Sequence, residues 1–422
     1  MPLPNMGPHV ASLLPPRVAH SRAEAPEAAN IARPASVETK PSVMMVLESM
    51  FPTKGGGGAE TQVRTLGSHL IAQGVPVSLL SPMVSYGSQV GDDNVDGIAV
   101  TRIAYPRLPG FGALIMLAKL AWLLFRLRNR YTIIHAHIAG NMAAVCCLMG
   151  WLLHKPVLVK LTGMTEMVGG ILDPNPSPAV RLRKRALRLA TYYQATSSQI
   201  GRLMQECGFD ARKVHLIPNA VDTQRFETVQ RDESKRRELC GERRIVGIFV
   251  GRLESEKNLE LMLDGWAQAF AKQQDAALVL VGAGRLMEPL KAQAERLGIG
   301  SQVIFVGASD AVERYMALAD FGLLTSNAEG LSNTLLEYMA SGLPVIGSRI
   351  SGTEDFVASG KTGWLFTAGD THQFKDCLHA AAQARANLAE LGQNARRHVV
   401  AQASIAAVVN RLLSLYKLQL VG

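Results

Sequence analysis

Short apolar runs rich in β-branched residues alternate with segments of helical periodicity from residue 42 onward. This alternation predicts right-handed βαβ units built around parallel sheets. The predicted strands of the first half are Val43–Glu48, Val75–Leu80, Ile98–Ile103, Thr132–His135, Val157–Leu161 and Tyr192–Thr196. Those of the second half are Ile245–Val250, Ala277–Val281, Val303–Val306, Phe321–Leu324 and Pro344–Gly347. We therefore predict an α/β protein of two doubly wound, Rossmann-like domains, with an interdomain ligand cleft at the carboxyl ends of the strands.

The flanking segments set the expected domain boundaries. Residues 1–40 are rich in Pro and Ala without a continuous apolar run, which favours a disordered leader over a secretory signal. We expect residues 41–216 to form the N-terminal domain and residues 217–400 the C-terminal domain. The helical pattern from Leu388 to Leu420 is long for one helix, so residues 401–422 are expected to pack back towards the N-terminal domain.

Composition narrows the class of protein. A chain of 422 residues is long enough for two hydrophobic cores. Its five cysteines are odd in number and lack metal-ligand spacing, which is typical of free thiols in a reducing cytoplasm. The longest apolar stretch, Phe111–Phe125, is interrupted by Lys119 and is too short for a normal membrane span.

The positive charge is concentrated in the first half of the chain. Residues 1–215 carry 22 Lys and Arg against 12 Asp and Glu, whereas the remainder carries 22 against 23. Within that half, Phe111–Arg130 and Ala179–Ala190 combine basic and apolar faces, the second through Arg181, Lys184, Arg185 and Arg188. Such helices suit an anionic membrane surface, the alternative being core helices with a solvated face. Nucleic acid is not expected, because no binding module is recognisable.

Glu329 and Glu337 stand eight positions apart around a predicted helix start. Ser332 or Asn333 is a natural N-cap, and Gly342 marks a natural stop. The spacing places one carboxylate on a loop at the helix mouth and the other one to two turns inside. Between them lie backbone N–H groups that favour anions. The pair therefore fits a phosphorylated, hydroxyl-rich ligand such as a sugar nucleotide, the alternative being a capped surface helix with two solvated glutamates.

Two further segments favour phosphate groups. The glycine run Gly55–Gly58 follows a strand and opens a helix, although it is neither a Walker loop nor the dinucleotide fingerprint. Arg252 and Lys257 follow the strand Ile245–Val250 and are placed to converge on one diphosphate. The alternative is a pair of solvated surface cations. No Asp-x-Asp pair occurs in the sequence, so we expect no metal and no other cofactor, with the cations replacing a divalent ion.

His135 and His137 end the strand Thr132–His135, and strand alternation places both imidazoles on the same side. Two histidines without carboxylate or thiolate neighbours are weak support for a metal site. We expect His135 to be a buried structural residue and His137, further along, to reach the cleft.

At these positions the chain resembles the family-four glycosyltransferases, retaining enzymes of the GT-B fold. The resemblance covers nearly all of residues 42–420 and is strongest over residues 245–366. The matching segments are Glu329 to Glu337, Gly251-Arg252 with Lys257-Asn258, Ile217–Asp222, Gly342–Ile346 and Gly360–Leu365. Two departures stand out: Ala220 where the family usually has Gly, and Leu331-Ser332 where many relatives have an aromatic residue and Gly. The second departure leaves the donor sugar open.

The resemblance implies a role for each matching residue. Arg252 and Lys257 would clamp the donor diphosphate, Glu337 would accept from the ribose hydroxyls, and Glu329 would hold hydroxyls of the transferred sugar. The remaining implied site residues are the backbone amides of Gly330, Leu331, Ser332 and Asn333, the glycines Gly57 and Gly58 that close over the diphosphate, and His137 near the transferred sugar.

These observations together predict a cytoplasmic, metal-independent retaining glycosyltransferase, peripheral on the inner face of the plasma membrane. It would move a sugar from a nucleotide-sugar donor to a lipid-linked or growing oligosaccharide acceptor in cell-surface polysaccharide synthesis. The alternatives are a sugar-nucleotide epimerase on the same fold and a non-catalytic nucleotide-sugar-binding member of a glycan assembly complex. A nucleotide-dependent oxidoreductase is a weaker alternative, because the dinucleotide fingerprint is missing.

Overall fold

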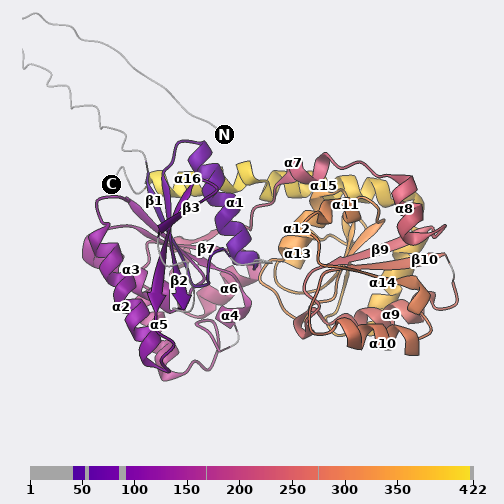
Figure 1. The fold of residues 1–422 in the computed structure, drawn as a ribbon, viewed down its shortest axis with the longest axis horizontal. Helices are drawn as coiled ribbons and strands as arrows, with labels where there is room; N and C mark the ends of the chain where they lie inside the picture. The colour runs from indigo at the N-terminus through magenta and orange to yellow at the C-terminus, as the bar shows by residue number, and fades with distance from the viewer. Residues whose placement is uncertain (1–40, 53–56, 85–91, 168, 274, 419–422) are drawn as a thin grey trace, which may run out of the picture. The chain divides into compact units, whose positions relative to one another are not determined.

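The computed structural model describes residues 41–52, 57–84, 92–167, 169–273 and 275–418. The expected leader and the glycines Gly55 and Gly56 lie outside these residues. Two parallel sheets organise the described chain (Figure 1). All eleven predicted strands are present, with ends that differ by up to four residues. Three short strands at or near sheet edges were not predicted, namely β3, β8 and β14.

The first sheet has the strand order β3-β4-β2-β1-β5-β6-β7-β8, and only the β3–β4 pair is antiparallel. Its strands are β1 (Val43–Leu47), β2 (Val77–Val84), β3 (Asp92–Val95), β4 (Ile98–Tyr105), β5 (Ile133–His137), β6 (Val157–Leu161), β7 (Tyr192–Ala195) and β8 (Val214–Leu216). The helices of this part are α1 (Gly58–Ala72), α2 (Phe111–Arg126), α3 (Asn141–Leu153), α4 (Met164–Met167), α5 (Pro178–Leu187) and α6 (Ser198–Glu206).

The second sheet has the order β11-β10-β9-β12-β13-β14 and is parallel throughout. Its strands are β9 (Ile245–Val250), β10 (Ala276–Val281), β11 (Val303–Gly307), β12 (Phe321–Leu324), β13 (Val345–Ser348) and β14 (Gly363–Phe366). The helices of this part are α7 (Thr223–Glu227), α8 (Glu233–Cys240), α9 (Leu259–Phe270), α10 (Met287–Arg296), α11 (Val312–Met316), α12 (Asn333–Ala340), α13 (Thr353–Phe356), α14 (Thr371–Gln383), α15 (Leu388–Ala403) and α16 (Ile405–Leu418).

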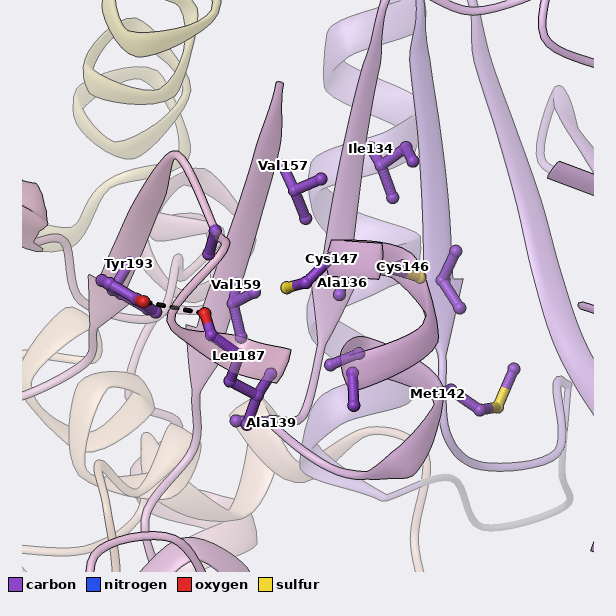
Figure 2. Packing of buried hydrophobic residues seen from close by; sticks show 14 of the residues in the cluster. Ile134, Ala136, Ala139, Met142, Cys146, Cys147, Val157, Val159, Leu187 and Tyr193 are labelled. Atoms are coloured by element: carbon purple, nitrogen blue, oxygen red, sulfur yellow. Dashed lines mark hydrogen bonds between the residues drawn. The ribbon is translucent and has the colours of Figure 1, made fainter. Parts of the chain in front are cut away.

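Alternation along β5 and β6 gives the first sheet two different faces. Ile134, Ala136, Val157 and Val159 point to the face covered by α3 and α5, where Tyr193 Oη donates to the Leu187 carbonyl oxygen at 2.8 Å (Figure 2). The opposite face packs against α1 and α16. The next residues along each strand, including the two histidines of β5, therefore point towards α1 and α16.

The long C-terminal helical pattern is divided at Ser404 into α15 and α16. The chain crosses between the two sheets twice, and the crossings touch: Val221 N donates to the Ala403 carbonyl and Ile405 N donates to that of Val221. Beyond this point α16 packs against α1, and its Tyr416 Oη lies 2.8 Å from His135 Nδ1. The C-terminal helix thus completes the core of the first sheet.

None of the helices in the described ranges combines the length and the apolar character needed to cross a bilayer.

Candidate active site

A cavity of about 680 Å³ lies between the carboxyl ends of the two sheets. Most of the predicted site residues line it: Gly57, Gly58, Arg252, Lys257, Glu329, Leu331, Ser332, Asn333 and Glu337. A larger hollow, about 860 Å³, is formed by residues near α7, α11 and α15. None of the predicted site residues is among the described residues that line this second hollow, so we assign the site to the first cavity.

The carboxylate motif folds as its sequence predicts. Ser332 is the N-cap of α12, with extended backbone angles (φ −69°, ψ 128°), although its side chain makes no capping bond. Glu329 precedes the helix on a loop, and Glu337 lies inside it. Removal from water raises the pKa of Glu337 to about 7, while the nearby charge of Arg225 opposes that rise. One carboxyl of the pair therefore titrates near neutral pH.

Arg252 and Lys257 line the cavity, and each is paired with its own glutamate. Lys257 Nζ donates to Glu329 Oε1 at 2.7 Å, and Ser326 Oγ donates to the same oxygen at 2.6 Å. Arg252 pairs with Glu256 at 2.7 Å, and its side chain is 70% exposed. Exposed pairs of this kind are weak, so the guanidinium of Arg252 is not committed to Glu256.

Asn333 connects the helix start to the other side of the cavity. Its Oδ1 accepts from Asn219 Nδ2 at 2.9 Å and from Gln62 Nε2 at 3.2 Å, and its Nδ2 donates to the Gly58 carbonyl at 3.2 Å. Gln62, on α1, is buried and also exchanges two hydrogen bonds with the backbone of Ala220. Sequence reasoning missed Gln62, because nothing near it in the chain marks a glutamine as buried.

Gly330 does not line the cavity within the described residues. It faces the end of β6, where a Cβ on Gly330 would come within 1.7 Å of the Thr162 carbonyl oxygen. On the other side, Gly163 adopts a φ of +120°, and a Cβ there would lie 2.3 Å from Gly330 Cα. Two backbones therefore touch here with no room for a side chain.

The prediction that His137 reaches the cleft is wrong in this structure. Strand β5 runs two residues further than predicted, so His137 stays inside the sheet and is 1% exposed. Its ring stacks on that of His135, with centroids 4.2 Å apart. Burial holds the pKa of His137 well below its usual value. The prediction that both rings lie on the same side is confirmed.

Lys160 is a cavity residue to which sequence reasoning assigned no role. It is the fourth residue of β6, is 1% exposed and lines the same cavity as Arg252 and Lys257. Burial lowers its pKa to about 7, partly opposed by the charge of Glu166. The only sequence signal is a lysine inside an otherwise apolar strand.

Two family models match the chain in succession. The model described as Glycosyltransferase Family 4 matches residues 56–225, and that described as Glycosyl transferases group 1 matches residues 230–398. The chain belongs to the family-four glycosyltransferases. The division between the two matches falls at the first crossing between the sheets, and the cavity takes residues from both.

Curated relatives of this glycosyltransferase are distant. It is 25% identical over 294 residues to the N-acetyl-alpha-D-glucosaminyl L-malate synthase of Bacillus anthracis, covering 68% of this chain and 75% of the relative. It is 29% identical over 270 residues to the sulfoquinovosyl transferase SQD2 of Arabidopsis thaliana, covering 60% of this chain. That match spans only about half of the plant enzyme, 49% of its length.

Solved structures establish the fold as GT-B. The Anabaena protein Alr3699/HepE, in complex with UDP, has a TM-score of 0.70 at 19% identity, covering 89% of this chain and 99% of that chain. At this identity the likeness concerns the fold alone. Within the described residues of the present glycosyltransferase, no three His, Cys, Asp or Glu side chains are grouped as metal ligands.

Proposed function

We propose that this glycosyltransferase moves a sugar, with retention of configuration, from a nucleotide-sugar donor to a lipid-linked or oligosaccharide acceptor in cell-surface polysaccharide synthesis. The observation that carries the proposal is that Arg252, Lys257, Glu329 and Glu337 all line one cavity. Support for a nucleotide-sugar donor also comes from the family and from the UDP bound to the Anabaena protein of the same fold.

The proposed chemistry follows from where charge develops. As the bond from the sugar C1 to the diphosphate breaks, negative charge grows on the leaving oxygen, and Arg252 and Lys257 stabilise it. Glu329 would orient the sugar through its hydroxyls, and Glu337 would accept from the ribose. The acceptor oxygen bonds to C1 on the face that the diphosphate leaves, and its proton passes to the departing phosphate. We propose that these cations make a divalent metal unnecessary.

Substitution of the clamp tests this proposal. We expect Arg252→Ala and Lys257→Ala each to lower kcat/KM about a hundredfold or more, since each removes an electrostatic contact to the leaving group. Transfer should need an acceptor and should continue in EDTA. Product from the donor alone would instead indicate an epimerase. Normal glycan in cells carrying only the double variant would indicate a non-catalytic binding protein.

The membrane part of the proposal rests on an exposed apolar surface formed by α2, α3 and α5, which pack side by side (Figure 1). We call it the α2–α3–α5 face. Its exposed side chains are Phe111, Leu114, Ile115, Trp122 and Phe125 on α2, Leu148, Trp151 and Leu152 on α3, and Leu182 and Leu189 on or beside α5. Of the predicted apolar side of α5, Leu182 and Leu189 are exposed and Ala186 packs against the core. The two exposed leucines favour a surface-binding helix over a core helix.

Cations accompany this apolar surface. Arg126 lies over the Trp122 ring at 5.0 Å, and Arg128 over the Phe125 ring at 4.4 Å. Arg181 and Arg185 on α5 are exposed. Aromatic residues beside arginines match the boundary between headgroups and acyl chains of an anionic bilayer. We propose that this face holds the enzyme on the inner face of the plasma membrane, where a lipid-linked acceptor would be presented.

Vesicle sedimentation tests the membrane proposal. We expect the protein to bind vesicles that contain phosphatidylglycerol, with binding weakened by salt and by neutralising Arg181, Lys184, Arg185 and Arg188 together. Replacing Trp122 and Trp151 by Gln should also reduce binding. The matched control is Leu418→Gln, another exposed apolar residue on a different helix. Unchanged sedimentation of both groups of variants would contradict the proposal.

A further inference from the structure

Lys160 combines three properties that a structural lysine rarely shows together. Its side chain is 1% exposed, it lines the active-site cavity, and its ammonium has no hydrogen-bond partner among the described residues. The charge of Glu166 acts on Lys160, but the carboxylate oxygens of Glu166 accept from the backbone N–H groups of Ala139, Thr162 and Gly163. The lysine is thus attracted by a carboxylate without being bonded to it.

The sheet offers Lys160 no compensating partner. Its cross-strand neighbours are His137 on β5 and Gln194 on β7, both buried. The two ring nitrogens of His137 also lack hydrogen-bond partners among the described residues. A buried, unpaired ammonium destabilises a folded protein considerably. An anion brought into the cavity would remove that penalty by forming a charge-assisted hydrogen bond.

Lys160 and the two cations of the proposed diphosphate clamp come from different domains. It belongs to the N-terminal domain, together with the other cavity residues Gln62 and Thr162, whereas Arg252 and Lys257 belong to the C-terminal domain. Building on the function proposed above, we propose that Lys160 binds a carboxylate or phosphate group of a substrate on the first-sheet side of the cavity, separate from the donor diphosphate. The enzyme would then act on an acidic sugar or a phosphorylated one.

The acidic group has two possible carriers, the transferred sugar or the acceptor, and paired ligands separate them. For the donor we would measure affinities of UDP-glucuronate against UDP-glucose and of GDP-mannuronate against GDP-mannose. For the acceptor we would compare glucose 6-phosphate with glucose in saturating UDP or GDP. We expect the acidic member of at least one pair to bind about tenfold tighter or more, and Lys160→Met to abolish that preference. The ligand pair whose acidic member binds tighter shows whether the transferred sugar or the acceptor carries the acidic group.

A matched control distinguishes this role from general damage. Lys155 precedes the same strand at its opposite end, and its Nζ already donates to the Tyr131 carbonyl at 2.9 Å. Lys155→Met should leave every ligand preference unchanged. If the wild type prefers no acidic ligand, or if Lys160→Met keeps the preference, the inference is wrong.

Thermal unfolding gives a second, independent readout. Because Lys160 is unpaired without ligand, Lys160→Met should raise the melting temperature of the ligand-free protein, whereas Lys155→Met should lower it. A lower melting temperature for Lys160→Met would overturn the inference, since it would assign the lysine a structural role. The proposed function itself would be contradicted by a different result. In that case the wild type would bind neither nucleotides nor neutral nucleotide sugars.

Discussion

At the scale of single residues, the cavity shows what a local motif can specify. Glu329, Glu337, Arg252 and Lys257 stand at fixed spacings within short segments, and all four line the cavity as predicted from those segments. Their partners could not be predicted in the same way. Glu256 is four residues from Arg252 in the chain, but its pairing depends on rotamers, and the Lys257–Glu329 pair joins positions 72 residues apart.

Glu337→Gln should change how the stability of the ligand-free enzyme depends on pH. The unfolded chain ionises this carboxyl near pH 4.5, whereas in the folded protein its pKa is about 7. Between these values the folded state binds more protons, so its stability falls as pH rises. Glu337→Gln has no carboxyl to ionise at this position, so it does not lose this stability. Its free energy of unfolding relative to the wild type should therefore rise progressively from pH 4.5 to 7. Above pH 7 the change in this stability difference should stay constant, at no more than about 3.5 kcal/mol.

Urea unfolding at several pH values would measure this effect. The control is Glu313→Gln, which removes a neighbouring carboxyl that contributes to the raised pKa of Glu337. That variant should reduce the pH effect without removing it. A constant difference between Glu337→Gln and the wild type across the whole range would show that the folded carboxyl is ionised throughout.

Glu329→Gln should reduce turnover more than nucleotide affinity. The carboxylate accepts from Lys257 and Ser326, and it is proposed to hold the transferred sugar rather than the ribose. We expect kcat to fall about a hundredfold, as when one preorganised electrostatic contact is removed. The affinity for the nucleoside diphosphate should change only slightly. Calorimetry and initial-rate kinetics check the two quantities separately, and a parallel loss of both would show that Glu329 acts mainly by holding Lys257.

At the scale of elements, periodicity predicted the interior strands and missed the edges. Strands β3 and β8 have four and three residues, and too few alternations to distinguish them from loops. The predicted strand also ended at His135, whereas β5 ends at His137. His137 was therefore expected in the cleft, although it lies in the sheet. The burial of Lys160 could not be predicted for a different reason. It depends on β5 and β7, which pair with β6 on either side, and no pattern within β6 indicates those neighbours.

The C-terminal helix α16 should contribute to stability through its buried side. Leu412 is fully buried against the first sheet, whereas Leu418 in the same helix is 62% exposed. Leu412→Ala should lower the free energy of unfolding by about 3 kcal/mol, because it leaves a cavity in a packed core. Leu418→Ala, the matched control, should change it by less than about 0.5 kcal/mol. Equal effects in denaturant unfolding would mean that α16 is not part of this core.

At the scale of the whole molecule, the site depends on two sheets meeting across one cavity. Gly330→Ala tests this meeting directly, because its methyl group would collide with the Thr162 carbonyl. We expect transfer activity to fall at least about tenfold, since misplacement by about 1 Å is costly for catalysis. The radius of gyration from small-angle scattering should increase. Gly201→Ala is the control, because its nearest neighbour would lie at an ordinary 3.9 Å. Full activity in Gly330→Ala would show that the contact is dispensable.

The adjoining crossings at Val221 and Ser404 have a consequence for engineering and for evolution. Residues 222–403 leave the first domain and return to it at neighbouring backbone positions, so topologically they are an insertion with both junctions at one place. Such a segment can be exchanged as a cassette without rerouting the remaining chain. A hybrid built this way would take Arg252, Lys257 and both glutamates from one parent and Lys160 from the other. Under the proposed roles, nucleotide specificity would then come from one parent and specificity for the acidic group from the other.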